Sequence, residues 1–120
     1  MIQLLPVTEQ AMLERLNRIY QQNAQFAYVC VEKREIKASC LYNIKGDVVE
    51  IVNVSSVEPD IFDGLVRAVF ASAMDLGLEH AVFDEKIDHE MLVQLHFVQD
   101  DGFSVNSLTK IIHNCKNCKA

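Results

Sequence analysis

The stretch that decides the fold is SSVEPDIFDGLVRAVF, residues 55–70, because it joins a strand to an apolar helix through a very short acidic connection. Pro59 should end the strand, since proline cannot donate to a ladder hydrogen bond. Asp60 is the predicted N-cap of the helix, and Gly77 is the predicted residue just past its end. The helix is apolar nearly all round, so we expect it to be buried against a sheet.

Upstream of this stretch, the sequence predicts a strand, a helix and a three-strand meander. Thr8 is the predicted N-cap of the helix, and apolar residues at helical spacing predict its buried face. The meander follows from two runs rich in Val, Ile, Tyr and Phe and a third rich in Val and Ile, separated by the turns EKRE and Gly46–Asp47. The segments are the strand 1–7, the helix 9–23 with Met12, Leu16, Ile19 and Tyr20 on its inner face, and the meander 25–57.

Downstream, the sequence predicts a strand, a helix and a last strand. The segment 80–87 is a short strand, and Asp88 should cap the amphipathic helix that follows it. The segment 103–112 is the predicted final strand, and 113–120 is a tail. The element order is therefore β-α-β-β-β-α-β-α-β, in a single domain over residues 1–112.

Composition limits the possible partners and the compartment. Half of the 120 residues are hydrophobic and 23% are charged, as in a globular protein. The net charge of −6 argues against a nucleic-acid partner and, more weakly, against an anionic membrane. The first ten residues have no basic region and no long apolar run, so we expect no signal peptide, a cytoplasmic location and reduced cysteines.

The tail HNCKNC carries the most conspicuous local chemistry. Cys115 and Cys118 have the C-x-x-C spacing of a zinc half-site or a redox pair, and His113 is a third possible ligand. A closed zinc site needs a fourth ligand, which Cys30, Cys40, His80 or His89 would have to supply. The alternative is a loose tail with two exposed thiols.

Three segments, in their order and spacing, resemble the Gcn5-related N-acetyltransferase (GNAT) family over nearly the whole chain. VNVSSVEP (52–59) resembles the fourth strand of that family, which ends in V-x-P. GLVRAVFASAMDLG (64–77) resembles the following helix, and LVQLHF (92–97) with DDGF (100–103) resembles the later L-x-x-x-L-G-F run and its turn. The resemblance implies an α+β fold with a mixed, mainly antiparallel sheet and helices on both faces.

The resemblance also implies a cofactor and its site. In that family an acyl-CoA such as acetyl-CoA lies in a V-shaped gap between the fourth and fifth strands, and its acyl group passes to an amine of a small molecule or peptide. The pantetheine arm would bond the backbone of the segment formed by Asn53, Val54, Ser55, Ser56 and Val57. The pyrophosphate would lie at the start of the next helix, where Asp63 and Gly64 stand.

The sequence departs from the family pattern at that helix start. The connection is about five residues shorter, it lacks the family arginine, and it keeps one glycine. Asp60 and Asp63 would each repel a phosphate by roughly 1 kcal/mol in water. DIFDG therefore predicts a tight, self-capped turn instead of a phosphate-binding loop.

The candidate catalytic groups are few. Glu50 is a candidate general base, or else a solvent-facing strand carboxylate. It stands one residue out of register with the family position, which a β-bulge would correct. Leu92 occupies the place of the tyrosine acid, and His96 replaces the glycine that follows. Two functions remain open: acyl transfer to an amine, or a catalytically inactive binding or regulatory module, acting through the tail. A homodimer through a strand edge is also possible.

Overall fold

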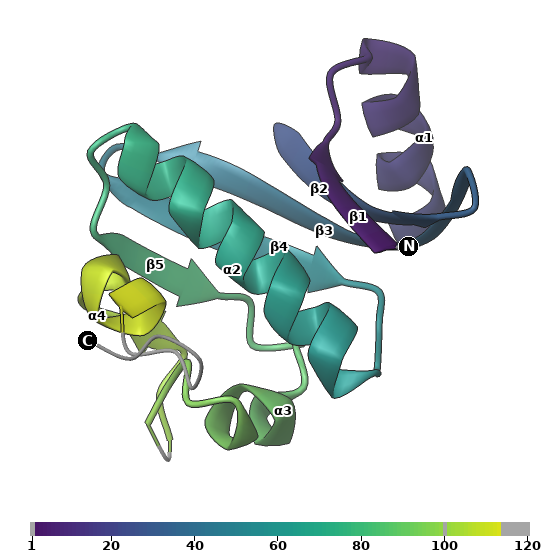
Figure 1. The fold of residues 1–120 in the computed structure, drawn as a ribbon. Helices are drawn as coiled ribbons and strands as arrows, with labels where there is room; N and C mark the ends of the chain where they lie inside the picture. The colour runs from purple at the N-terminus through teal and green to yellow at the C-terminus, as the bar shows by residue number, and fades with distance from the viewer. Residues whose placement is uncertain (1, 100, 114–120) are drawn as a thin grey trace.

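The computed structural model describes residues 2–99 and 101–113, and over these residues the chain forms a six-stranded sheet in the order β1-β2-β3-β4-β5-β6 (Figure 1). The strands β1 to β4 pair antiparallel, β4 and β5 pair parallel, and β5 and β6 pair antiparallel. This confirms the mixed, mainly antiparallel sheet. The elements are β1 (Ile2–Pro6), α1 (Gln10–Tyr20), β2 (Phe26–Glu32), β3 (Glu35–Lys45), β4 (Val48–Val54), α2 (Pro59–Asp75), β5 (His80–Phe83), α3 (His89–Gln94), β6 (Ser104–Val105) and α4 (Leu108–His113).

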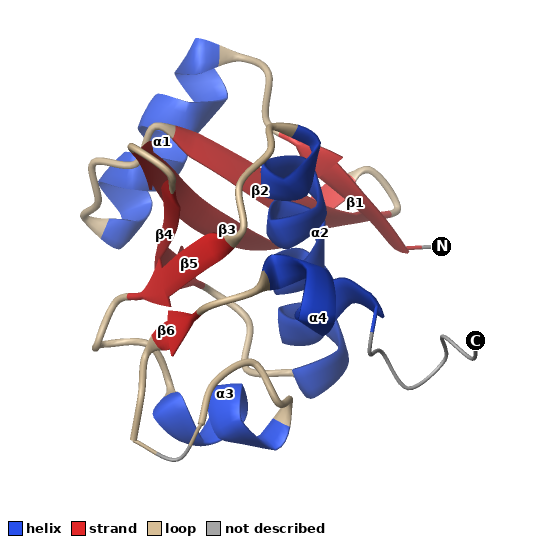
Figure 2. Cartoon of the chain, turned by 90° about the vertical axis from the view of Figure 1, so that its left-hand side faces the viewer, coloured by secondary structure: helices blue, strands red, loops and turns tan. Residues whose placement is uncertain are grey.

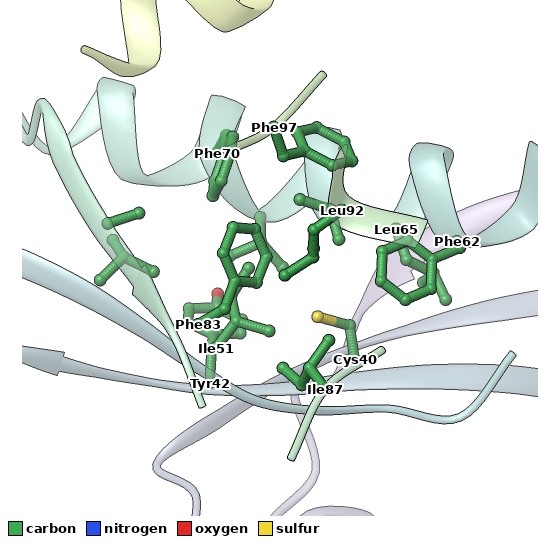
Figure 3. Close-up of a cluster of buried hydrophobic side chains, with 14 of the residues drawn as sticks. Cys40, Tyr42, Ile51, Phe62, Leu65, Phe70, Phe83, Ile87, Leu92 and Phe97 are labelled. Atoms are coloured by element: carbon green, nitrogen blue, oxygen red, sulfur yellow. The ribbon is translucent and has the colours of Figure 1, made fainter. Parts of the chain in front are cut away.

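Helices cover both faces of the sheet, as expected, and each face has its own core (Figure 2). The larger core lies between the sheet and α2, where Phe70, Phe83 and Phe97 pack with ring centroids 5.8 to 6.1 Å apart (Figure 3). The smaller core lies between the other face and α1 and includes the buried Leu16 and Leu41. Because side chains alternate along a strand, each strand residue belongs to either the α2 face or the α1 face of the sheet.

The hairpins follow the predicted meander. Glu32 and Glu35 pair across the first turn, so the loop has two residues, Lys33 and Arg34. Both have positive φ, 53° and 67°, as a type I′ turn requires. In the second turn Gly46 has φ 63°, which glycine adopts without a steric penalty.

The prediction for the start of α2 was wrong by two residues. The helix begins at Pro59, with Glu58 as N-cap, and Asp60 lies inside the first turn. Proline suits the first helical position because its fixed φ fits the helix and it has no N–H to satisfy there. DIFDG is thus helix and not a turn, and the connection from β4 to α2 is residues 55–58. Gly77, with φ 83°, ends the helix as predicted.

The last predicted strand was wrong in most of its length. β6 covers Ser104–Val105 and α4 follows at once. Glu79 caps that helix, because its carboxylate accepts hydrogen bonds from the Thr109 side chain and backbone and from Ser107 Oγ. Those hydrogen bonds, the one from the Thr109 side chain first, lower the pKa of Glu79. A long-range contact, which local sequence does not encode, therefore selects helix over strand.

The other helix ends differ less from their predicted positions. The N-cap of α1 is Glu9 and not Thr8, and Ile19 is 58% exposed, so the buried face of α1 is narrower than predicted. Asp88 caps α3 as predicted, because its carboxylate accepts from the Met91 N–H at 3.3 Å. Among the described residues, none of the helices is long and apolar enough to cross a membrane.

Candidate functional site

The candidate site begins where the two parallel strands β4 and β5 part. They pair from Val48 and His80 to Ile51 and Phe83, and the Asp84 N–H then donates to the Ile51 carbonyl at 2.8 Å. Beyond this point β4 continues along β3, whereas the chain after Phe83 turns away toward α3. The edge of β4 that faced β5 is thereby uncovered, at the carboxyl ends of two parallel strands, where open sheets commonly bind ligands.

A cleft of about 180 Å³ lies at this point. It is smaller than the roughly 300–1,000 Å³ typical of drug-sized ligand pockets, so it suits a narrow or extended group. Its walls are the end of β4 with the connection to α2, the start of α2, the connection between β5 and α3 with the first turn of α3, and the second residue after the end of α1. The lining residues are Gln22, Val52, Asn53, Val54, Ser56, Val57, Phe62, Lys86, Ile87, Asp88 and Met91.

The backbone of β4 presents hydrogen-bonding groups to this cleft. The Ile51 carbonyl points toward β5, and the Ser55 N–H points the other way, donating to the Ser39 carbonyl of β3 at 2.9 Å. Backbone groups of successive strand residues alternate in direction. The N–H and C=O of Val54 therefore face the gap, where an extended ligand would pair with them as an added strand does.

A β-bulge in β4 decides which side chains reach the cleft. Leu41 pairs with Asn53 and Tyr42 pairs with Ile51, so Val52 is the extra residue. Because cross-strand partners share a face, Asn53 lies on the α1 face together with Leu41, and Val52 packs into the same α1-side core. The Asn53 Oδ1 atom is buried and has no hydrogen-bond partner among the described residues.

The two serines in the predicted arm-binding segment have different roles. Ser55 is absent from the cleft lining, because its Oγ accepts from the Ser39 N–H at 2.8 Å and ties the end of β4 to β3. Ser56 lines the cleft, and its Oγ accepts from the Glu58 N–H at 3.1 Å in the turn before α2. Val57 is 83% exposed at the mouth. Four of the five predicted residues thus line the cleft.

The structure places Asp63 and Gly64 away from the cleft lining, inside α2. The carboxylate of Asp63 accepts two hydrogen bonds from Arg67 Nε, at 3.0 and 3.1 Å. A Cβ on Gly64 would lie 3.0 Å from Leu4 Cδ1, so the glycine permits close packing of α2 against β1. Both residues therefore have a structural role. Their positions outside the cleft lining do not support the predicted contact with a phosphate.

Glu50 lies on the α1 face, before the bulge and outside the cleft lining. Its side chain is 31% exposed. Asn43 Nδ2 donates to its Oε1 at 3.3 Å, and Lys45 Nζ lies 3.3 Å from the same atom. Because the bulge at Val52 lies between them, Glu50 and Asn53 share the α1 face of β4. Glu50 is the carboxylate of β4 and remains the candidate general base.

The other family positions carry no acid. Leu92 is fully buried in the core. His96 follows the end of α3 with φ 64°, in the left-handed conformation that glycine favours. Its N–H donates to the Val93 carbonyl and the Phe97 N–H donates to the Leu92 carbonyl, the pair of bonds of a Schellman motif. His96 therefore keeps the backbone geometry of the glycine it replaces.

Among the described residues, sequence analysis missed Gln22 and Lys86 in the lining. Lys86 is exposed and stands close to Asp88, which already caps α3. A basic residue three positions after β5 in an acidic chain was the available signal for Lys86. No local signal marks Gln22, because its position depends on how α1 packs on the sheet.

The cysteines give no support to a metal site. Cys30 and Cys40 are buried under α2, and burial raises the pKa of both thiols. In the described part of the chain, no group of three or more His, Cys, Asp or Glu residues could hold a metal ion. Cys115 and Cys118 lie outside the described residues, and His113 is the last residue of α4. The zinc prediction is therefore unsupported.

Comparison with known proteins identifies the fold. No family model and no curated protein sequence matches the chain. Among solved structures, the ribosomal-protein-S18-alanine N-acetyltransferase from Escherichia coli matches with a TM-score of 0.60 and 9% identity, over 88% of this chain and 90% of that one. A GNAT family acetyltransferase from Elizabethkingia anophelis with acetyl-CoA bound gives 0.56 and 11%, over 88% and 92%.

The IAA acetyltransferase from Bacillus cereus gives a TM-score of 0.58 and 15% identity, over 81% of this chain and 75% of that one. Identities this low establish a shared fold and leave the activity open. The chain therefore has the fold of the Gcn5-related N-acetyltransferases.

Proposed function

We propose that the protein binds an acyl-CoA in the cleft between β4 and β5 and transfers the acyl group to an amine. The observation that carries this proposal is the position of the cleft, at the parting of two parallel strands within the acetyltransferase fold. The pantetheine arm is a narrow chain with two secondary amides. It would run along residues 53–57 and bond the exposed backbone of Val54 as an extra strand would.

The reaction needs little from side chains. The amine nitrogen attacks the thioester carbonyl, a C–N bond forms, the C–S bond breaks, and the amine proton leaves with the CoA thiol. The protein would hold the two reactants together, which lowers the entropic part of the barrier. A backbone N–H in the gap, such as that of Val54, would stabilise the negative charge on the carbonyl oxygen. Glu50, on the α1 face, is the candidate base that removes the amine proton through water.

The nucleotide end of the cofactor would contribute little to binding. Pro59 has no N–H, and the Phe62 N–H donates to the Glu58 carbonyl at 2.9 Å, so the first turn of α2 offers the N–H groups of Asp60 and Ile61. The carboxylates of Glu58 and Asp60 stand beside those groups and repel a diphosphate. We therefore expect most of the binding free energy to come from the pantetheine arm.

A thermal-shift titration with acetyl-CoA, CoA and acetyl-pantetheine tests the proposal. A ligand that binds the folded state adds RT ln(1 + [L]/Kd) to stability, about 2.7 kcal/mol at a hundredfold excess over Kd. Ser56→Glu, which puts a carboxylate in the cleft, should abolish the shift, whereas Ser104→Glu on the exposed side of β6 should leave it unchanged. Absence of a shift with all three compounds at millimolar concentration would contradict the proposal.

A second function, binding without catalysis, is favoured by the chemistry of the lining. Among the described residues that line the cleft, Lys86 and Asp88 are the titratable ones, and the Asp88 carboxylate is occupied as a helix cap. Release of the CoA thiol from acetyl-CoA in the presence of a panel of primary amines separates the two functions. Binding together with thiol release that depends on the amine supports transfer, and binding alone supports the second function.

A further inference from the structure

The buried amide oxygen of Asn53 is the feature of the cleft that the proposed function does not use. Its Oδ1 atom is shielded from solvent and has no hydrogen-bond partner among residues 2–99 and 101–113. An unpaired buried acceptor destabilises a folded protein, and native structures hold few of them. Since Asn53 also lines the cleft, a rotation of its side chain would present this oxygen to a ligand with an N–H group, which would supply the missing donor.

We propose that Asn53 is the residue that binds the acceptor amine, by accepting a hydrogen bond from its nitrogen. This inference rests on the proposed function, because it assigns the second substrate of the same cleft. The substrate class that it predicts is a primary amine, whose nitrogen offers two or three N–H groups. A neutral amide oxygen accepts from both the charged and the uncharged amine.

The geometry of β4 favours the amine over the pantetheine arm as the partner. Backbone groups lie in the plane of the sheet, whereas side chains stand roughly perpendicular to it. An arm in the gap between β4 and β5 lies in that plane and meets the backbone of Val54. The Asn53 side chain instead projects toward the α1 face, where its partner across the ladder is Leu41. A molecule that reaches its oxygen therefore approaches from the α1 face.

Two further features place the acceptor on that face. Gln22, which follows α1, lines the same cleft from this side. Glu50, the candidate base, lies on the same face of the same strand. The bulge at Val52 is what brings Asn53 to this face, because a regular strand would have turned residue 53 toward α2. The acyl-CoA and the acceptor amine thus reach the same part of β4 from two directions.

The test compares Asn53→Leu with Asn43→Leu. Leucine is close to asparagine in size and removes the unpaired acceptor, so Asn53→Leu should raise the melting temperature of the ligand-free protein. Asn43 is the control, because both ends of its amide have partners: its Oδ1 accepts from the Gln25 N–H at 2.7 Å, and its Nδ2 donates to Glu50. Asn43→Leu should lower the melting temperature.

The binding readouts locate the partner. Asn53→Leu should raise KM for the amine by about tenfold or more, the value of one good hydrogen bond, and leave the affinity for acetyl-CoA unchanged. In the wild type, propylamine and glycinamide at millimolar concentration should shift the NMR signals of the Asn53 side-chain NH₂. This last readout needs no acyl-CoA, so it separates failure of the inference from failure of the proposed function.

Three outcomes would overturn the inference. A loss of acetyl-CoA affinity in Asn53→Leu with an unchanged KM for the amine would assign Asn53 to the pantetheine arm. A lower melting temperature with no effect on either substrate would make Asn53 a structural residue that a water molecule satisfies. Absence of any NMR shift in the wild type with either amine, with and without CoA, would exclude amine binding at this residue.

Discussion

The two ends of the cleft differ in how firmly the core of the protein holds them. At the parting of β4 and β5 the strand pairing, the bulge and the exposed backbone of Val54 are all present. At the start of α2, the connection consists of residues 55–58, and Glu58 and Asp60 flank the first turn. The first end is held by the core, since Ile51 and Phe83 are buried there, whereas residues 55–58 belong to neither core cluster. Folding therefore preserves the first end and leaves the second free to change.

The largest expected effect comes from breaking the core beneath the parting strands. Phe83, at the end of β5, is 2% exposed and packs on Phe70 and Phe97. Phe83→Ala should lower the free energy of unfolding by about 3–5 kcal/mol and abolish the ligand-induced thermal shift. Urea denaturation measures the first effect. Val82→Ala, one residue earlier and half-buried on the other face, should cost much less, and equal losses would refute the idea that the core holds the cleft open.

A middle-sized effect should follow from removing negative charge at the start of α2. The double variant Glu58→Gln, Asp60→Asn removes two carboxylates near the expected diphosphate position. At about 1 kcal/mol for each carboxylate in water, or about 2 kcal/mol for both, the affinity for CoA should rise by roughly thirtyfold at low salt, and the gain should shrink as salt is added. Isothermal titration calorimetry with CoA and with pantetheine checks this.

The control for the charge variant is Asp75→Asn, at the far end of the same helix, which should have no effect on either ligand. Pantetheine carries no diphosphate, so its affinity should stay constant in all variants. An equal rise for pantetheine and CoA would mean that the carboxylates disturb the cleft as a whole and not the nucleotide end.

The smallest effect concerns α3, which contributes Met91 to the cleft wall. His96 holds a left-handed conformation, which costs a residue with a Cβ roughly 1–2 kcal/mol, partly offset by the greater freedom of glycine in the unfolded chain. His96→Gly should therefore raise the free energy of unfolding by about 0.5–1 kcal/mol without changing ligand affinity. His96→Ala serves as the comparison, because it removes the imidazole but keeps the strained backbone, and a similar gain in it would assign the effect to the side chain.

Local chemistry explains which parts of the fold were predicted correctly. As predicted, the carboxylate of Asp88 caps α3 and Gly77 has a positive φ after the end of α2. The apolar residues of α2 are largely buried, which was also predicted. Each depends on residues within a turn or two of sequence. The last strand was mispredicted because α4 is capped by Glu79, about 30 residues away in the chain, through its bonds to Thr109. Local propensity carries no information on such a contact.

The candidate site also has a part that the sequence predicted and a part that it did not. The segment 52–59 identified the strand that forms the cleft, and four of its five predicted contact residues line it. Asp63 and Gly64 were assigned to a phosphate site on the family resemblance alone, and the structure shows that they serve an ion pair and close helix packing. Gln22 and Lys86 were missed, because the elements that carry them meet the cleft only after the chain has folded.

By itself, the sequence determined the order of the elements as far as β6 and the burial of α2, because these depend on residue type and periodicity. Only the tertiary structure decided that Val52 bulges, that Asn53 faces α1 with an unpaired oxygen, and that β4 and β5 separate after Ile51. A bulge is a mismatch between two strands, so it exists only once β3 and β4 are paired, and no run of residues in either strand contains it.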